Sequence, residues 1–556
     1  MVYMTDIKII LLLLVLLPGK LQAFLPADDT MNCHSGIWFP DLGNDYYQNP
    51  IIHADYSDPD VIRVGNGFYM TASSFNCVPG LPILHSNDLV NWKIVNHALS
   101  ELIPYDTFSV PRHGCGVWAP SIRFHDGEFY IFWGDPDYGI YMTKTKDPVG
   151  EWSEPFLIKA GRGWIDPCPL WDDDDHAPDG LGQAYLVHAW AGSRSGLKSM
   201  LMVHRMSADG TRLLDDGVMV FDGHMDNRTV EGPKFYKKDG FYYIFAPAGG
   251  VTEGWQLVLR SENVLGPYES KVVLHQGNTE INGPHQGAWI ITPLGNENWF
   301  IHFQDKGAYG RVVHLQPIQW KDGWPLIGID RDDDGIGEPV SQYKKPAVIG
   351  VNPVCIPQGS DEFDEPFPGR QWQWHANPSP GSGFPSGRMG YYRLNALTIP
   401  ESNKNLWEVP DLFLQKFTAE EFTATTRIEF YPHQTGDKTG LIIMGMDYAY
   451  IGLEKRDDGL HIQQVVCEDA GAGSSEDCIE SRLIEGNVLY LRVVVRKDAR
   501  CRFFYSLDNV GFYPLGTAFT AQPGKWIGAK IGYFCTGSIR SNDSGYVNID
   551  WFRITH

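Results

Sequence analysis

The sequence lacks an excess of positive charge. Its 556 residues include 45 Lys and Arg against 68 Asp and Glu, which gives a formal net charge of −23. A nucleic-acid-binding protein needs a basic surface that neutralises phosphates, and anionic membranes attract basic segments rather than acidic ones. The composition therefore disfavours nucleic acids and membranes as partners and fits a neutral partner such as a carbohydrate.

Long hydrophobic runs are also scarce, and the conspicuous one lies at the N-terminus. Lys8 precedes an apolar run from Ile9 to Leu17, and Leu21-Gln22-Ala23 resembles a cleavage site. The run is short for a membrane-spanning helix, so residues 1–23 are interpreted as a signal peptide, with an uncleaved anchor as the minor alternative. We therefore expect a secreted or periplasmic protein.

The number of cysteines is odd. There are nine, so complete pairing within the chain is excluded. Cys467 and Cys478 bracket a Gly/Ser/acidic loop and could close it as a disulfide, which export would permit although spacing alone does not establish it.

A long helical period is missing from the first two-thirds of the chain, where five segments share one pattern instead. Each has a small or polar opening, an apolar strand, a Gly-containing turn and a second aromatic or β-branched strand. They read SDPDVIRVGNGFYMTASS, APSIRFHDGEFYIFWGD, IDPCPLWDDDDHAPDGLGQAYLVHAW, EGPKFYKKDGFYYIFAPAGG and HQGAWIITPLGNENWFIHFQD. Their spacing favours a five-bladed β-propeller over residues 24–343, with five hairpins in a barrel or sandwich as the alternative.

The openings of these units carry the candidate chemistry. They lie near Asp58, Ala119, Asp166, Glu231 and His285. Because equivalent positions of a propeller converge on its axis, we expect three carboxylates and a histidine at one mouth of the channel. A single Asp-Pro is more simply explained as a turn, but three aligned carboxylates favour a site.

Paired carboxylates are the groups that glycoside hydrolysis requires. In an inverting enzyme, Asp58 would be the general base that activates water, and Glu231 the general acid that protonates the leaving oxygen. Asp166 would lie between them, where its negative charge would raise the pKa of the acid. Asp60 matches no carboxylate in the other units and is interpreted as a strand-edge residue.

The last third of the chain predicts a second domain. Residues 344–360 are punctuated by Pro and Gly and are interpreted as a linker. Residues 361–556 contain alternating strands such as LYLRVVVRK and GYVNIDWFRI and no obvious helix, which favours a β-sandwich.

These motifs resemble glycoside hydrolase family 43, which includes β-xylosidases and α-L-arabinofuranosidases. The resemblance runs through NPIIHADYSDPDVIRVGNGFYMTASSFNC, GVWAPSIRF, WIDPCPLW, VEGPKFY and GPHQGAW, and continues in DEFD and GLIIMGMDYAYIGLEK of the C-terminal region. It implies a five-bladed propeller, a concanavalin-like sandwich and inversion, with Asp58 as base, Asp166 as pKa modulator and Glu231 as acid.

The resemblance also implies further site residues. Phe75 and Trp118 match aromatic walls of the sugar pocket, with blade packing as the alternative, and Arg311 matches an arginine that contacts sugar hydroxyls. His285 matches a central histidine that in several members supports a calcium ion. One histidine is a poor indicator of calcium, which prefers oxygen ligands.

A structural calcium ion in the sandwich is a further hypothesis, with Asp361 and Asp550 as candidate ligands, and no cofactor is expected to be required for catalysis. The run Asp172–Asp175 does not fit the spacing of a calcium-binding loop and is interpreted as a solvated turn.

The sequence thus predicts an exo-acting hydrolase that releases terminal pentose from plant cell-wall glycans, with β-xylosidase favoured and α-L-arabinofuranosidase, or both activities, as the alternative. A catalytically inactive glycan-binding propeller and an interaction scaffold are rivals, but neither needs all three carboxylates. A retaining fructan hydrolase would carry Asn-Asp-Pro-Asn-Gly, Arg-Asp-Pro and Glu-Cys, which differ from the motifs present here. The oligomeric state is left open.

Overall fold

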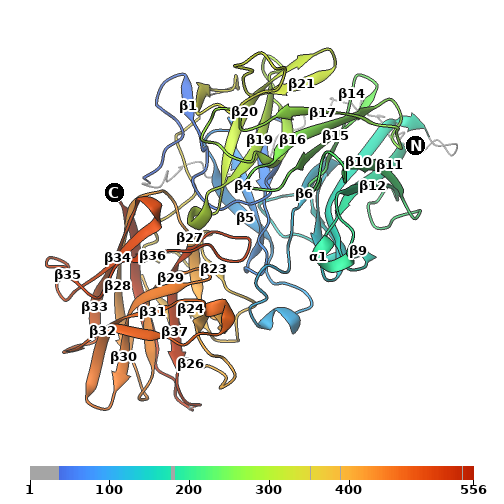
Figure 1. The fold of residues 1–556 in the computed structure, drawn as a ribbon. Helices are drawn as coiled ribbons and strands as arrows, with labels where there is room; N and C mark the ends of the chain where they lie inside the picture. Colours follow the sequence, from blue (N-terminus) through green and yellow to red (C-terminus); the bar gives the residue numbers. More distant parts are fainter. Residues whose placement is uncertain (1–36, 177–181, 351, 389, 541) are drawn as a thin grey trace, which may run out of the picture. The chain divides into compact units, whose positions relative to one another are not determined.

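The computed structural model describes residues 37–176, 182–350, 352–388, 390–540 and 542–556, so the signal peptide predicted at 1–23 lies outside the described residues. The fold is all-β (Figure 1). In the described residues the only α-helix is α1 (Gly192–Ser195), beside short 3-10 turns at η1 (Thr107–Ser109), η2 (Gly307–Tyr309), η3 (Leu406–Glu408), η4 (Ala470–Ala472) and η5 (Lys497–Ala499). No helix in this described part is long and apolar enough to cross a membrane.

Five four-stranded antiparallel sheets follow one another along the described chain. The first contains β2 (Asp60–Val64), β3 (Gly67–Thr71), β4 (Gly80–Ser86) and β5 (Lys93–Leu99). The second contains β6 (Ser121–His125), β7 (Glu128–Asp135), β8 (Gly139–Thr145) and β9 (Phe156–Ala160). The third contains β10 (Trp164–His176), β11 (Gly182–Trp190), β12 (Met200–Met206) and β13 (Val218–Asp222). The fourth contains β14 (Lys234–Lys238), β15 (Phe241–Ala248), β16 (Trp255–Ser261) and β17 (Glu269–Leu274). The fifth contains β18 (His285–Ile291), β19 (Asn298–Asp305), β20 (Arg311–Lys321) and β21 (Trp324–Ile327).

The five sheets close into a ring. Strand β2 contacts β6, β6 contacts β10, β10 contacts β14, and β18 returns to β2. One buried cluster joins Phe68 and Met70 of the first sheet to Ala288 and Ile301 of the fifth. The predicted five-bladed β-propeller is therefore confirmed, with each sheet as one blade.

The hairpin turns form where Asp-Gly predicts them. Asp126-Gly127 joins β6 to β7, and Asp239-Gly240 joins β14 to β15. Both residues of each pair have positive φ, near 48° and 78° in the first turn and 49° and 81° in the second. Two central residues of positive φ give a turn whose twist matches that of the flanking strands.

Two eight-stranded sheets form the C-terminal β-sandwich. One contains β23 (Gln373–Trp374), β26 (Leu397–Thr398), β27 (Phe413–Lys416), β29 (Lys438–Met444), β30 (Tyr448–Arg456), β31 (Gly459–Cys467), β32 (Asp477–Ile484) and β37 (Lys530–Gly537). The other contains β24 (Gly383–Pro385), β25 (Tyr392–Asn395), β28 (Phe422–Tyr431), β33 (Val488–Arg496), β34 (Arg500–Ser506), β35 (Tyr513–Pro514), β36 (Phe519–Thr520) and β38 (Tyr546–Thr555). Alternate residues of β33 from Leu489 to Val495 are fully buried in the core between the sheets, as the period of two requires.

The segment between the domains begins with paired backbone. Strand β22 (Gln342–Lys344) pairs with β1 (Tyr46–Gln48), and Lys345 donates its amide to Asp45. The chain before the first blade is thus tied to the chain after the fifth, across the boundary predicted at 343/344.

Two interpretations from the sequence are wrong. Cys467 and Cys478 are free thiols, because the register pairs Cys478 with Val465 and leaves Cys467 further along its strand. Asp172 is not in a solvated turn: it belongs to β10, is 2% exposed, and bonds Lys237 Nζ and Tyr242 Oη at 2.5 Å each.

The sandwich contacts the propeller through buried backbone groups. Asn377, 1% exposed, accepts the amide of Leu102 through Oδ1 and donates to the Leu102 carbonyl through Nδ2, both at 2.8 Å. Asn76 of the propeller donates to the His375 carbonyl at 2.7 Å. These hydrogen bonds join residues 375–377 of the sandwich to the propeller.

Replacing Asn377 by Leu tests this contact. We expect the free energy of unfolding to fall by about 2–4 kcal/mol, because two buried backbone groups of Leu102 lose their partners. Urea denaturation measures the change. The exposed Asn542→Ala serves as control and is expected to change stability by less than about 0.5 kcal/mol. A loss of under about 1 kcal/mol for Asn377→Leu would contradict the role given to this contact.

Candidate active site

The three predicted carboxylates lie where the first strands of their blades begin. Asp58 precedes β2, Asp166 is near the start of β10, and Glu231 precedes β14. The carboxyl group of Asp166 interacts electrostatically with both Glu231 and Asp58. The ring of blades thus brings together three residues that are far apart in the sequence.

Glu231 and His285 lie one residue earlier in their blades than Asp58 and Asp166 do in theirs. Asp58 and Asp166 have φ of 55° and 57°, and the corresponding left-handed residues of the fourth and fifth blades are Gly232 (φ 57°) and Gln286 (φ 41°). Glu231 and His285 therefore precede the equivalent position. Non-glycine residues in this conformation are strained and cluster at functional sites.

Asp58 is held by hydroxyl groups and an arginine. Its Oδ2 accepts hydrogen bonds from Ser57 Oγ at 2.7 Å and Ser73 Oγ at 2.6 Å. Arg311 Nη1 lies 3.5 Å from both carboxylate oxygens and donates to Ser57 Oγ at 2.5 Å. The carboxylate, 6% exposed, thus has a fixed orientation, as a general base requires.

Asp166 and Glu231 form an interacting pair. Burial raises the pKa of Asp166 well above its usual value, and the charges of Glu231 and Asp58 raise it further, while the amide of Gly232 opposes this by donating to Oδ2 at 2.8 Å. The protonated form of Asp166 is therefore favoured. Glu231 has a side chain 30% exposed, so it is the member that a ligand can reach.

His285 and Arg311 both pack against the ring of Phe303. His285 Nε2 is 3.1 Å from Glu231 Oε1, and its ring centroid is 5.5 Å from that of Phe303. The Arg311 guanidinium lies 4.8 Å from the same ring centroid. His285 thus contacts the expected acid and Arg311 the expected base.

The aromatic candidates Phe75 and Trp118 come from adjoining backbone segments. Phe75 exchanges two backbone hydrogen bonds with Val117, the residue before Trp118. Phe75 is 3% exposed and has φ 50°, whereas Trp118 is half-buried and lies under the Arg194 guanidinium at 5.8 Å.

Two residues at this site have no counterpart in the sequence prediction. Trp526 of the sandwich lies 5.9 Å from the Arg311 guanidinium and is 45% exposed. Gln286, 3% exposed, packs its side chain against Gly232, and its Nε2 has no partner among the described residues. Gln286 could have been found from the repeat pattern, because it follows His285 by one residue. Nothing in the sequence around Trp526 indicates that it reaches this site.

A buried layer of polar groups lies next to the carboxylates. Asp60, 0% exposed, is the first residue of β2 and pairs with Arg123 at 2.6 Å. Lys234, also 0% exposed, donates to the Pro120 carbonyl at 2.7 Å and to Ser121 Oγ at 2.8 Å. The Lys234 charge opposes the rise in the pKa of Asp166.

The candidate metal ligands of the sandwich have protein partners. Asp361 accepts the amides of Phe363 and Gly369 and the indole N–H of Trp372. Asp550 Oδ2 pairs with Arg427 at 2.5 Å. His285 offers one ring nitrogen toward a carboxylate oxygen, which is not the oxygen-rich donor set that calcium prefers. Calcium at these three residues stays a prediction.

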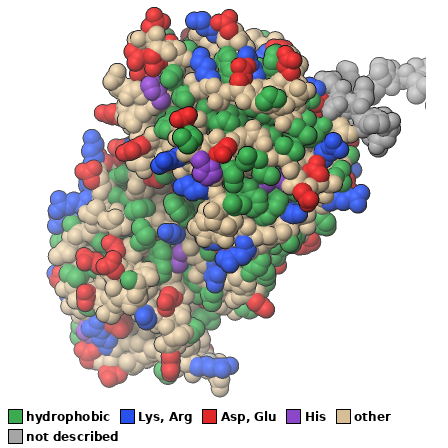
Figure 2. All heavy atoms as spheres, turned by 45° about the vertical axis from the view of Figure 1, so that its right-hand side comes forward, with side chains coloured by type: hydrophobic (Ala, Val, Ile, Leu, Met, Phe, Trp, Pro, Cys, Tyr) green, Lys and Arg blue, Asp and Glu red, His purple; other side chains and the backbone are tan. Residues whose placement is uncertain are grey.

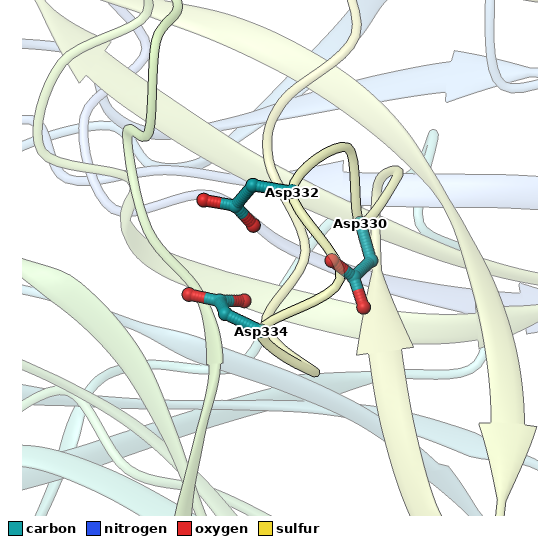
Figure 3. Close-up of side chains that lie close together, drawn as sticks. All are labelled: Asp330, Asp332 and Asp334. Carbon is teal, nitrogen blue, oxygen red and sulfur yellow. The ribbon is translucent and has the colours of Figure 1, made fainter.

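A different acidic group offers three oxygen donors. Carboxylate oxygens of Asp330, Asp332 and Asp334 lie within 4.8 Å of one another in the segment after β21 (Figure 3). The order Asp-x-Asp-x-Asp-Gly is a sequence signal for such a group, although Ser341 stands where a calcium-binding EF-hand loop has Glu. Asp332 and Asp334 are exposed, and exposed acidic groups are common without an ion.

The surface shows no basic tract on the face in Figure 2. Lys and Arg side chains are interspersed with acidic ones there. This distribution agrees with the acidic composition of the sequence.

A propeller that gathers three carboxylates at its axis and continues into a concanavalin-like sandwich is the architecture of a glycosidase. The family model for glycosyl hydrolases family 43 matches residues 47–325, and the model for the beta-xylosidase C-terminal concanavalin A-like domain matches residues 360–555. The chain therefore belongs to glycoside hydrolase family 43 and is a glycosidase.

Relatives match over most of the chain. A putative beta-xylosidase of Xylanibacter ruminicola is 38% identical, with 89% of this chain and 87% of that protein covered. A beta-xylosidase of Formosa agariphila is 33% identical, with 96% and 94% covered. A non-reducing end alpha-L-arabinofuranosidase of Bacteroides ovatus is 26% identical, with 93% and 96% covered. The crystal structure of a family 43 protein from Bacillus licheniformis has 25% identity and a TM-score of 0.77, with 92% and 99% covered.

The buried Asp166 makes stability depend on pH. Its pKa is raised in the folded state, so the folded protein holds a proton that the unfolded chain releases above about pH 4. Stability should therefore fall as the pH rises from there toward the folded pKa. We expect Asp166→Asn to have a higher Tm than the wild type at pH 7, no advantage near pH 3, and almost no activity.

Calorimetry between pH 3 and pH 8 measures this effect. Asp135, 3% exposed, is a matched control because burial raises its pKa to about 7 outside the carboxylate group. Asp135→Asn should show the same sign of stabilisation at pH 7 with activity retained. A lower Tm of Asp166→Asn at pH 7 would show that the carboxylate is stabilising rather than strained.

Proposed function

We propose that the protein is an inverting, exo-acting β-xylosidase that releases terminal xylose from plant cell-wall oligo- or polysaccharides. The observation that carries this proposal is the convergence of Asp58, Asp166 and Glu231 in three different environments. The two relatives above 30% identity are named as beta-xylosidases, which supports xylose as the sugar.

The roles follow from these environments. Asp58, fixed by two hydroxyl groups and Arg311, would take a proton from a water molecule that attacks the anomeric carbon. Glu231, the accessible carboxyl group beside Asp166, would give a proton to the leaving oxygen. Asp166 would act on Glu231 through their electrostatic interaction. His285 would orient Glu231 through their 3.1 Å contact. Water is the nucleophile, so the reaction requires no cofactor.

Trp526 supports exo action. The sandwich brings this indole to the Arg311 side of the site, and Gly114, whose carbonyl accepts the Trp118 indole N–H, lies against it. Aromatic faces stack on sugar rings, so Trp526, Phe75 and Trp118 would enclose one terminal residue. A chain end would enter such a site more readily than the middle of a polymer.

We also propose that the protein is exported, on the strength of the apolar segment and cleavage-like site in residues 1–23. Its substrate is extracellular on this proposal, because plant cell-wall glycans are polymers that do not enter cells intact. Structural calcium at His285, Asp361 or Asp550 remains part of the proposal.

Glu231→Gln tests the acid. We expect activity on xylobiose to fall by about 10²–10⁴-fold, since a poor leaving group needs the proton, and activity on an aryl xyloside with a good leaving group to fall much less. Asp58→Asn should be nearly inactive on both substrates. Steady-state kinetics measure both. Equal losses on both substrates for Glu231→Gln would rule Glu231 out as the acid.

The sugar and the stereochemistry are tested together. Wild-type enzyme is assayed on 4-nitrophenyl β-D-xyloside and α-L-arabinofuranoside and on xylo- and arabino-oligosaccharides, and early product is followed by proton NMR. We expect preference for the β-xylosides and release of α-xylose. Preference for the arabinofuranoside would favour the alternative that the Bacteroides ovatus relative suggests. Initial β-xylose would contradict inversion.

A further inference from the structure

One buried carboxylate joins the sandwich to the propeller beside the active site. Asp55 lies three residues before Asp58 and is 5% exposed. Its Oδ1 accepts the backbone amide of Arg311 at 2.9 Å, and its Oδ2 accepts the backbone amide of Gly528 at 3.0 Å. Each oxygen therefore serves a different domain.

The packing around Asp55 leaves no room for another arrangement. A Cβ on Gly310 would lie 2.5 Å from the Cβ of Asp55, and a Cβ on Gly528 would lie 2.7 Å from the Gly310 amide. Ala529 adds a backbone bond to Ala308 at 2.7 Å. The two glycines allow the sandwich loop and the chain leading into β20 to approach backbone to backbone.

The loop held in this way carries Trp526, two residues before Gly528. Trp526 has φ 64°, a left-handed conformation that is strained for a tryptophan and persists only where its surroundings fix it. Its ring lies 5.9 Å from the Arg311 guanidinium, which itself contacts Asp58. Asp55 thus binds the backbone of Arg311 and of Gly528, two residues after Trp526, and so anchors both segments whose side chains meet at the site.

We propose that Asp55 is a positioning residue: by accepting the amides of Arg311 and Gly528 together, it sets Trp526 beside Arg311 and so determines how tightly the terminal sugar is held. The inference rests on the proposed function only in taking this site as the sugar site. It does not depend on which pentose is bound.

A double-mutant cycle of Asp55→Asn and Trp526→Ala tests the proposal, with KM and kcat measured on 4-nitrophenyl β-D-xyloside. Asparagine keeps one acceptor oxygen and places an N–H₂ against the other amide. We expect KM to rise about tenfold for each single variant and kcat to change less than about threefold, since Asp58 keeps its hydrogen bonds from Ser57 and Ser73. In the Trp526→Ala background, Asp55→Asn should raise KM less than about threefold, because the ring it positions is gone.

Glu420→Gln is the matched control. It breaks the ion pair between Glu420 of the sandwich and Lys306 of the propeller, which joins the same two domains without contacting Trp526. KM should be unchanged. A rise equal to that of Asp55→Asn would overturn the proposal, because any loosening of the domain contact would then suffice. Effects of Asp55→Asn and Trp526→Ala that multiply in the double variant would overturn it as well.

Gly528→Ala covers the case in which Asp55→Asn does not fold. Its new methyl group must push the loop away from Gly310 while Asp55 is left in place. A similar rise in KM in this folded variant supports the proposal, and an unchanged KM overturns it. If the wild type cleaves only the arabinofuranoside, the β-xylosidase function fails, and the same cycle is then run on that substrate.

Discussion

The mutual repulsion of buried carboxylates is the constraint on which this site depends. Asp166 is fully enclosed beside Glu231 and Asp58, and burial and the neighbouring charges raise its pKa. Like charges in a low-dielectric interior separate unless the backbone that carries them is rigid. Here the first strands of three blades hold them, and each blade is tied to its neighbours by buried apolar clusters.

The surroundings divide the carboxylates by role. Asp58 receives two hydroxyl hydrogen bonds and a guanidinium, whereas Asp166 receives one backbone amide and faces Glu231. The proposed division of the carboxylates between base and acid rests on this difference in surroundings. The buried cation of Lys234, bonded to Pro120 and Ser121, limits the excess negative charge at the axis.

The sandwich takes part in the site rather than being an appended module. Its loop brings Trp526 to Arg311, and Asp55 fastens that loop to the propeller. The same domain contact includes Asn377, which bonds the Leu102 backbone in the loop after the first blade, and His375, whose carbonyl accepts from the Asn76 side chain. The contact between Asp55 and Gly528 joins residues more than 400 positions apart in the chain.

Local patterns in the sequence were sufficient for the architecture and for the three carboxylates. Asp-Gly pairs such as Asp126-Gly127 specify hairpins through their own backbone preferences, and five repeated units imply one axis. The exact alignment of the repeats could not be derived from the sequence. In the first and third blades the left-handed position holds Asp58 and Asp166, whereas in the fourth blade it holds Gly232, so Glu231 lies one residue earlier.

Only the tertiary structure determined which side chains pair with one another. Asp172 looks like part of a solvated turn in the sequence, yet Lys237 pairs with it from another strand. The partner of Asp60, Arg123, also lies on another strand. Cys467 and Cys478 look like a disulfide, yet strand register separates them. The sequence by itself determined the propeller and the convergence of Asp58, Asp166 and Glu231, because hairpin and repeat signals are local. Only the folded chain determined what surrounds them, since burial, charge pairing and the approach of Trp526 arise from contacts between distant segments.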